Sequence, residues 1–401
     1  MFTPSSQIPL FASELIAGRP RPLGVYVPVL LDKRGELEAL AKAGGGVWDS
    51  MTPLIQMLPT GDRGPDEKAF SIVEWIERLR RGVGDHLIYL DPGGVARRST
   101  RSKPMPPAVV EGLYAQASRD GLSFIPVYTI GRTDLAAVTA SVAHEERRGL
   151  ALRVRIGNLT YRGARRLVDG AFAEFEDLGI TPLSTDLMVD LGYLDRDAEI
   201  DAAGLDPLFA EFERAAPWRS VTLAATTVPA SFAEFVRDGD LEGVPRREWS
   251  LWKGLRALGH EGLRYSDYAI QNCVPPDPMN AKNMRASIRY GVPDWLFVAR
   301  GVGPVQSLPR EEKAAQYQEL AVKLMLHPPF VGRACCDGDR FIEECADGLR
   351  QVRAQQVWRE IGTLHHLHMI TLAIADYTAA RAITPRRRSP NRSSSDAPVP
   401  R

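Results

Sequence analysis

The sequence has few of the features that mark several large classes of protein. It has four cysteines and no Cys-x-x-Cys pair, which argues against a disulfide framework and is typical of reduced thiols in the cytosol. It has no run of about 18 apolar residues, so no membrane span is expected. Met1–Ala17 has no basic segment ahead of its apolar residues, so we expect no signal peptide. These absences favour a cytoplasmic protein with no membrane partner.

The sequence also lacks an excess of either charge. It has 50 Lys and Arg residues against 50 Asp and Glu residues, which gives a formal net charge of zero. This balance argues against a generally basic nucleic-acid binder, although a local basic patch remains open.

Eight short apolar runs form the repeating feature of the chain. They are Val25–Leu31, Thr52–Leu58, His86–Asp91, Phe124–Ile130, Leu150–Ile156, Asp186–Leu191, Ser220–Thr226 and Leu263–Ile270. Such runs are typical of strands buried on both faces, and a helix-like segment separates each pair. The alternation predicts an α/β fold, a (β/α)8 TIM-barrel-like domain whose site would lie at the C-terminal ends of its strands.

The 401 residues exceed the roughly 250 of such a barrel, so we expect additional parts. Residues 1–23 are expected to form a loose arm, 24–275 the barrel, and 276–383 a C-terminal β-hairpin and helical appendage packed on the barrel. The hairpin is predicted from alternation in Ala286–Tyr290 and Trp295–Arg300. Residues 384–401, rich in Arg, Ser and Pro, should be disordered.

Four local patterns carry further expectations. Gly44-Gly45-Gly46 is expected to close a helix, because glycine tolerates a left-handed cap, rather than to form a phosphate loop. Ala230–Arg237 is predicted to be helical, and the long C-terminal helix is expected to break near Gly362. The basic segment Arg97–Lys103 is either a solvated loop or an anion-steering lid.

Charged and polar residues lie at or near the predicted strand ends. They are Lys33, Gln56, Asp91, Arg153, Asp190 and Asp267. Lys33 could be a Schiff-base nucleophile or could hold an anion. Arg153 and Arg155 alternate with apolar residues and so share a face, which we expect to point into the barrel and to pair with acids. Otherwise this strand lies in less buried surroundings. For the whole set, the alternative to a site is a network of buried ion pairs that fills the end of the barrel.

The three aspartates of this set suggest a second chemistry. Carboxylate oxygens are ligands for Mg²⁺, and the neighbouring cations would suit a phosphate-bearing substrate. Metal-assisted hydrolysis of a phosphoester is therefore one hypothesis.

Histidines and cysteines gather only near the C-terminus. His365 and His368 would share a helix face, but no second ligand pair lies at zinc spacing, so no metal ligand is assigned. His366 could reach the barrel rim as a general acid or base. The adjacent Cys335 and Cys336 are expected to be structural, and Asp339 to cap a helix.

The hairpin adds Arg289, Tyr290 and Arg300. If it folds over the barrel mouth, these residues could bind nucleotides or single-stranded nucleic acid. They could equally dock the C-terminal helices.

Short motifs recur in the order found in one known family. They are Tyr26-Val27-Pro28, Lys33, Gly35-Glu36, Ala39-Leu40 and Pro53-Leu54-Ile55 near the start, then Asp267-Tyr268, Ile288-Arg289-Tyr290, Trp295, Arg300-Gly301, Gly332, Gly338-Asp339, Trp358 and His365-His366. Over roughly residues 25–375 the chain resembles the beta family proteins, named after a phage beta protein. That family usually has a glutamate after Pro-Leu-Ile, where this chain has Gln56. The resemblance implies the fold more than an activity.

Two functions follow as hypotheses. In the first, an enzyme acts on an anionic, phosphate-bearing substrate at the barrel mouth, with Lys33, Asp190, Asp267 and His366 in catalytic roles and Gln56, Asp91, Arg153, Arg289 and Arg300 binding the ligand. In the second, a non-catalytic protein uses the same mouth to recognise a protein partner in phage–host conflict. Neither hypothesis identifies a cofactor.

Overall fold

The computed structural model describes residues 24–58, 71–93, 104–157, 161–274 and 284–383. The expected arm (1–23), the basic loop (97–103) and the expected disordered tail (384–401) lie outside the described residues. Within the described ranges, no helix combines the length and apolarity that crossing a bilayer requires.

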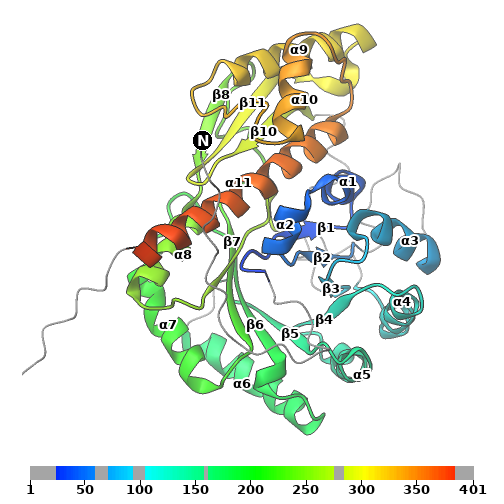
Figure 1. Ribbon diagram of the computed structural model, residues 1–401, viewed down its shortest axis with the longest axis vertical. Helices are drawn as coiled ribbons and strands as arrows, with labels where there is room; N and C mark the ends of the chain where they lie inside the picture. The colour runs from blue at the N-terminus through cyan, green and yellow to red at the C-terminus, as the bar shows by residue number, and fades with distance from the viewer. Residues whose placement is uncertain (1–23, 59–70, 94–103, 158–160, 275–283, 384–401) are drawn as a thin grey trace, which may run out of the picture.

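Eight parallel strands form one sheet in the order β1-β2-β3-β4-β5-β6-β7-β9. They are β1 (Val29–Leu31), β2 (Leu54–Gln56), β3 (Ile88–Asp91), β4 (Phe124–Thr129), β5 (Leu150–Arg155), β6 (Thr185–Tyr193), β7 (Ser220–Thr226) and β9 (Arg264–Ser266). Backbone hydrogen bonds join the first strand to the last, from Val27 N to Tyr265 O at 2.8 Å and from Val29 N to Asp267 O at 2.7 Å. The sheet therefore closes, and the predicted barrel is confirmed (Figure 1).

Helices surround the barrel. They are α1 (Arg34–Lys42), α2 (Gly45–Ser50), α3 (Ile72–Val83), α4 (Pro107–Arg119), α5 (Ala136–Glu146), α6 (Tyr161–Asp177), α7 (Ala202–Ala215) and α8 (Arg247–Leu258). α3 begins at a capping box in which Ser71 and Glu74 exchange hydrogen bonds. The triple glycine does not close α1: Ala43 and Gly44 are both extended, and α2 begins at Gly45. The left-handed cap predicted there is wrong because the chain turns directly into this second helix.

Strand side chains alternate between two apolar environments. Val29, Leu54 and Val127 belong to a cluster inside the barrel, whereas Leu30, Ile55 and Leu152 pack against the surrounding helices. This period of two decides which charged residues reach the barrel interior.

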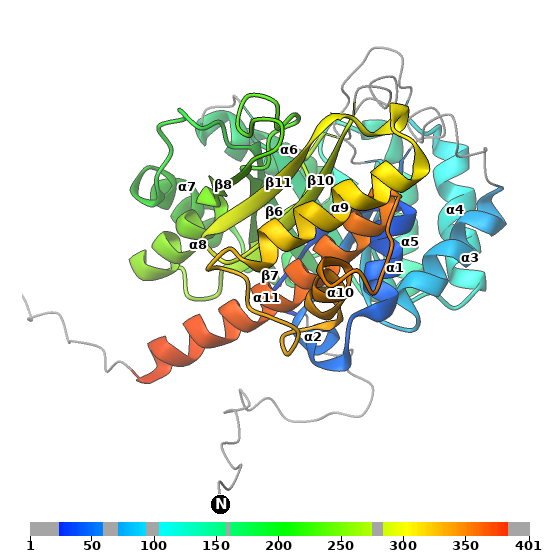
Figure 2. The ribbon, with the colours of Figure 1, turned by 90° about the horizontal axis from the view of Figure 1, so that it is seen from above.

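A second sheet of three antiparallel strands lies beside the barrel, in the order β10 (Arg285–Gly291), β11 (Trp295–Pro304) and β8 (Leu241–Pro245). Its outer face packs on α9 (Arg310–Met325), α10 (Asp337–Ala346) and α11 (Gln355–Ile383) (Figure 2). Its other face packs on segments that follow barrel strands, through Leu296, Val298 and Ile270. The hairpin and helical appendage were therefore predicted correctly.

The segment between β7 and α8 differs from the prediction. Residues 230–237 form bends and turns instead of a helix, and the chain then enters β8. Phe232 and Val236 are buried between the second sheet and the barrel. That packing, together with the pairing of β8 with β11, outweighs local helix propensity.

The long helix α11 is not broken near Gly362. A Cβ atom at this position would lie 2.7 Å from the Arg289 carbonyl oxygen and 2.8 Å from Ile270 Cδ1. The glycine therefore allows close approach to β10 and the barrel within an intact helix. α11 runs from the second sheet across the barrel to α8 (Figure 1), where the Tyr377 hydroxyl donates to the Lys253 carbonyl oxygen.

Candidate functional site at the barrel mouth

The C-terminal ends of the barrel strands bring charged side chains together inside the barrel. We define the mouth cluster as Asp91, Arg153, Arg155, Asp190 and Tyr268. Asp91 ends β3, the two arginines lie on β5, Asp190 lies on β6, and Tyr268 follows β9. The prediction that the arginines point inward and pair with acids is confirmed.

Arg153 is the centre of the cluster and has no exposed surface. Its Nη1 lies 2.9 Å from Asp91 Oδ2, and its Nη2 lies 2.8 Å from Asp190 Oδ2 and 2.7 Å from the Tyr268 hydroxyl. Tyr268 in turn donates to Asp190 Oδ2 at 2.6 Å. One guanidinium therefore bridges two buried carboxylates.

Backbone and hydroxyl groups complete the cluster. The Gly93 N–H donates to Asp91 Oδ1 at 3.1 Å, and the Gly192 N–H donates to Asp190 Oδ1 at 2.9 Å. The Thr129 hydroxyl donates to Asp91 at 3.3 Å. Both carboxylates are thus held by several donors.

These contacts fix the charge states. Burial alone would raise the pKa of Asp190, but the two arginines and the Tyr268 hydroxyl hold it below its usual range. Burial raises the pKa of Tyr268 well above its usual range, so the phenol stays protonated at neutral pH. The cluster thus holds an ionised Asp190 next to a neutral phenol.

Arg155 is the least satisfied member of the cluster. Its Nε lies 3.3 Å from Asp190 Oδ2, and its side chain is 26% exposed. Its terminal Nη2 is buried and has no hydrogen-bond partner among the described residues. Within the part of the chain that the structure describes, a guanidinium donor at the mouth therefore lacks an acceptor.

Gln56 and Lys33 lie on the same side of the barrel. Gln56 is buried at the end of β2, where it is in register with Asp91, so the mouth position predicted for it is confirmed. Lys33 follows β1, is half-buried, and is the N-cap residue of α1. Its role as a nucleophile or anion ligand stays a prediction.

Sequence reasoning missed Glu36 as a site residue. Its carboxylate accepts hydrogen bonds from the Leu31 N–H at the end of β1 and from the Gln271 side chain after β9. Burial raises its pKa to about 7, against the opposing charges of Arg359 and Lys33. An acid in the first turn of a helix is ordinary in sequence, so only the fold reveals its burial.

Arg289 lies where the second sheet meets the barrel. Its Nη1 donates to the Ile270 carbonyl oxygen at 2.7 Å, and its guanidinium lies over the Phe232 ring, 4.8 Å from the centroid. Burial, together with the charge of Arg359, lowers its pKa to about 9. It stands beside the segment that follows β9, and its role in binding a ligand at the rim stays a prediction.

Asp267 and His366 do not join the mouth cluster. Asp267 Oδ2 lies 2.9 Å from His366 Nε2 and 2.5 Å from Arg246 Nη2, and all three residues are buried. Asp267 precedes Tyr268, which faces inward, so strand alternation turns it to the outer wall of the barrel. The expectation that Asp267 and His366 reach the mouth is therefore corrected.

Arg300 also contacts residues outside the cluster. Its Nη1 donates to the Val236 carbonyl oxygen at 2.8 Å, and its Nε lies 3.1 Å from Asp238 Oδ1. It therefore holds the connection between β7 and β8.

The arrangement does not assemble the three-aspartate metal set. Asp91 and Asp190 are already bound to Arg153, and Asp267 faces away from them. A cation at the mouth would have to displace the Arg153 guanidinium.

Comparison with known proteins gives distant structural likenesses. The carboxyl transferase domain of Rhizobium etli pyruvate carboxylase has a TM-score of 0.36 at 12% identity, covering 63% of this chain and 42% of that one. A 3-dehydroquinate dehydratase from Geobacillus kaustophilus HTA426 has a TM-score of 0.36 at 11% identity, covering 63% and 86%. This chain thus spans less than half of the carboxyl transferase structure.

At the level of sequence, no curated protein matches the chain. The pattern of one protein family, described as Beta protein, matches residues 26–371. That match covers most of the chain and confirms the resemblance seen in its short motifs. The chain belongs to the Beta protein family.

Proposed function

We propose that the barrel mouth binds a small anionic ligand, whose phosphate or carboxylate group accepts a hydrogen bond from Arg155. The observation that carries the proposal is the buried Arg155 Nη2, which has no acceptor among the described residues. A buried donor without a partner costs about 1–3 kcal/mol, and an anion would remove that cost. A planar guanidinium also suits the paired oxygens of these anions.

The opposite end of the barrel provides an internal comparison. There the partly exposed Arg219 and the buried Arg264 form a second network with Asp186 and the Tyr89 hydroxyl. Each terminal nitrogen of these two arginines has an acceptor. A network that only supports the fold can therefore be fully satisfied in this barrel, which favours a ligand as the reason for the unmatched nitrogen at the mouth.

The charges next to the cluster favour an anion as well. The formal charges of the two aspartates and two arginines of the mouth cluster cancel. The electrostatic potential at a bound ligand would therefore come mainly from charged residues around the cluster. Lys33 and Arg289 lie on the side of the mouth formed by β1 and the segment after β9. The pKa of Glu36, their acidic neighbour, is about 7, so it is only partly ionised at neutral pH.

The proposal assigns binding and leaves the reaction open. Metal-assisted hydrolysis has less support than anion binding without a metal, because Arg153 already binds both carboxylates at the mouth. The Asp267–His366 pair is buried on the outer wall and is better suited to support the fold than to meet a substrate.

The test is a thermal-shift and titration-calorimetry screen of the purified chain. The ligands are inorganic phosphate, a dicarboxylate, nucleotides and sugar phosphates, each with and without Mg²⁺. Arg155→Gln is compared with Arg165→Gln, because both arginines are 26% exposed and bound to an acid, and Arg165 lies on the outer helix α6.

We expect at least one anion to raise the unfolding midpoint without Mg²⁺, and Arg155→Gln alone to weaken its binding. Equal binding by both variants, or no binding by any anion, would overturn the proposal. Conversion of the bound ligand would favour an enzyme, and binding without conversion a recognition protein.

A further inference from the structure

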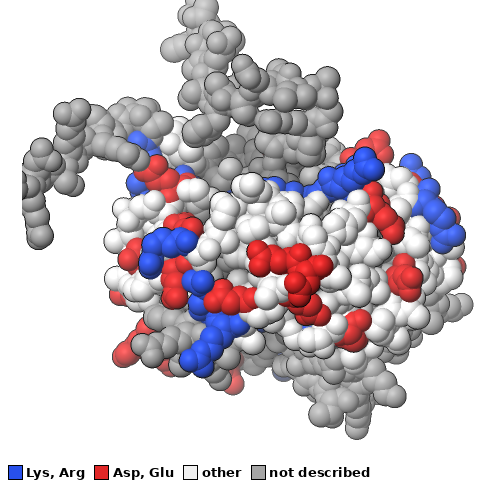
Figure 3. All heavy atoms as spheres, turned by 90° about the horizontal axis from the view of Figure 1, so that it is seen from below, with Lys and Arg blue, Asp and Glu red and all other residues white. Residues whose placement is uncertain are grey.

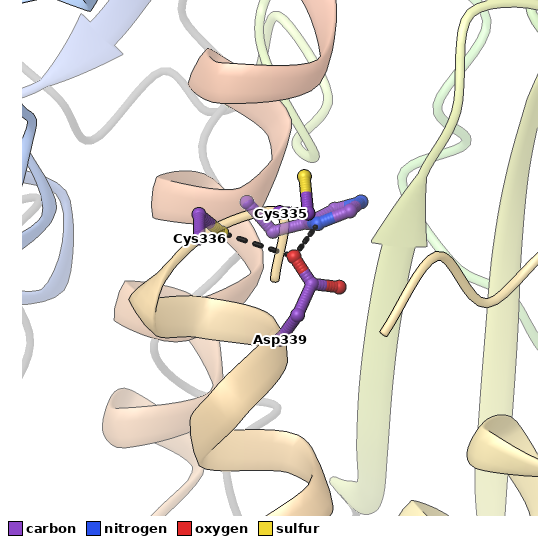
Figure 4. Close-up of side chains that lie close together, drawn as sticks. Cys335, Cys336 and Asp339 are labelled. Atoms are coloured by element: carbon purple, nitrogen blue, oxygen red, sulfur yellow. Dashed lines mark hydrogen bonds and ion pairs between the residues drawn. The ribbon is translucent and has the colours of Figure 1, made fainter. Parts of the chain in front are cut away.

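Four potential metal ligands, none of them a member of the mouth cluster, meet where α10 packs on α11. Cys335 and Cys336 precede α10, Asp339 lies in its first turn, and His365 lies on α11. One donor atom from each residue can be chosen so that all four lie within 4.8 Å of one another. Figure 4 shows Cys335, Cys336 and Asp339 gathered at the start of α10, beside α11. We call these four residues the thiol cluster.

The hydrogen bonds of His365 turn its Nδ1 toward the cluster. Its Nε2 lies 3.0 Å from the Gly291 carbonyl oxygen, which can only accept, so Nε2 bears a hydrogen. Nδ1 lies 2.9 Å from Asp339 Oδ2. A proton on Nδ1 makes this contact a hydrogen bond when no metal is bound, and a metal ion that displaces the proton would find the nitrogen and the carboxylate oxygen side by side.

The surroundings orient the ligands as they do in metal centres. Metal-bound histidines usually donate their other N–H to a carbonyl or carboxylate, as His365 does to Gly291. The Tyr290 hydroxyl donates to Asp339 Oδ1 at 2.7 Å, which leaves Oδ2 turned toward the cysteines. The Tyr290 ring also stacks on His365, with centroids 3.8 Å apart.

The packing of α10 on α11 allows this approach. A Cβ atom at residue 338 would lie 3.0 Å from the Ile361 carbonyl oxygen and 3.3 Å from Cys336 Sγ. Gly338 therefore lets the first turn of α10 come close to α11. Asp339 and His365 are fully buried, whereas both cysteines are half-buried, so the cluster remains accessible from their side.

We propose that the thiol cluster binds Zn²⁺ through two thiolates, one carboxylate oxygen and His365 Nδ1. Two sulfurs, one nitrogen and one oxygen make a tetrahedral zinc set, whose ligand atoms would lie roughly 3.3–3.8 Å apart. Cys336 Sγ already lies 3.0 Å from Asp339 Oδ2, so only small shifts are needed. The ion would link α10 to α11 next to His366, which binds Asp267 of the barrel.

The test is the zinc content and zinc affinity of the full chain, measured by elemental analysis and by competition with a chromogenic chelator. Cys336→Ala is compared with Cys345→Ala, because Cys345 lies on the same helix, is buried, and is outside the cluster. We expect one equivalent of zinc in the wild type and in Cys345→Ala, and an affinity at least about 100-fold lower in Cys336→Ala.

Two further measurements guard against a variant that fails to fold. Cobalt replacing zinc in the wild type should give thiolate-to-metal charge-transfer absorption. Tyr290→Phe keeps all four ligands but removes the donor to Asp339, so zinc affinity should fall about 10- to 100-fold. Wild-type protein that binds neither metal at micromolar concentrations, or equal zinc in the two alanine variants, would overturn the proposal.

Discussion

The mouth cluster and the thiol cluster favour ligands of opposite charge. At the mouth, Arg153 bridges two carboxylates, and a donor nitrogen of Arg155 has no acceptor among the described residues. In the thiol cluster, a carboxylate, an imidazole and two sulfurs converge on one place. An unmatched donor favours an anion and converging ligand atoms favour a metal cation, so the two clusters support different ligands.

One face of the molecule mixes side chains of both charges. On the face seen in Figure 3, acidic and basic side chains are interspersed among the described residues. That mixture agrees with the formal net charge of zero. It gives no support on this face to the weaker expectation of nucleic-acid binding.

The largest expected effect on stability comes from a substitution at the centre of the mouth cluster. Arg153→Met leaves Asp91 and Asp190 buried without their common partner, so the free energy of unfolding should fall by about 3–5 kcal/mol. Urea denaturation measures it. The control Arg165→Met removes a partly exposed pair on α6 and should cost less than about 1 kcal/mol. Similar losses in both variants would show that Arg153 is not central.

Glu36 gives the mouth side of the barrel its own pH dependence of stability. The pKa of Glu36 rises from 4.5 to about 7 on folding, so the folded state binds the extra proton between these values. Stability contributed by the protonated acid is therefore lost as pH rises through this window, by about 3 kcal/mol in total. Relative to wild type, Glu36→Gln should gain that stability between pH 4.5 and pH 8.

Urea unfolding of both proteins across this range is the measurement. Glu38→Gln, a change at a more exposed acid on the same helix, is the control and should show a much smaller pH-dependent difference. A constant difference between Glu36→Gln and wild type would mean that Glu36 ionises in the folded protein as it does in water.

Removal of zinc should lower the stability of the folded chain without changing anion binding at the mouth. At free zinc about 100-fold above its dissociation constant, chelation should lower the free energy of unfolding by about 2.7 kcal/mol. The same treatment should leave anion binding by the folded chain unchanged. Loss of anion binding on chelation would contradict the separation of the two clusters.

The smallest effect on stability is expected at Arg155. Arg155→Gln removes one long contact to Asp190 and also the cost of the unpaired donor, and the two effects oppose each other, so the free energy of unfolding should change by less than about 1 kcal/mol. Anion affinity should nevertheless fall at least about 10-fold, because a charge-assisted hydrogen bond is lost. A variant that binds as tightly as wild type would leave the unmatched nitrogen without a ligand.

The barrel could be predicted because its strands are apolar runs of regular spacing. Period-two alternation predicts that alternate residues of a strand share a face, and it placed Arg153 and Asp190 inside the barrel. The rule gives the face only when the orientation of one residue of the strand is already known. Asp267 was assigned to the mouth because it lies near a strand end, although its neighbour Tyr268 is the residue that faces inward. A shift of one residue separates the two faces.

Other parts depend on contacts between segments distant in the sequence. Strand β8 contains Gly243 and Pro245 and forms by pairing with β11, so its own residues give little strand signal. The thiol cluster joins residues 335–339 to His365 through the packing of α10 on α11. No ligand spacing in the sequence indicates that meeting, and the cysteines were therefore expected to be structural.

The most direct test measures both ligands on the same preparations of two variants, Arg155→Gln and Cys336→Ala. Phosphate, or the tightest anion found in the screen, is titrated by calorimetry, and zinc is measured by elemental analysis. We predict that Arg155→Gln loses the anion and keeps zinc, whereas Cys336→Ala loses zinc and keeps the anion. Loss of both ligands in either folded variant, or of neither in both, would contradict the assignment of one anion site and one cation site.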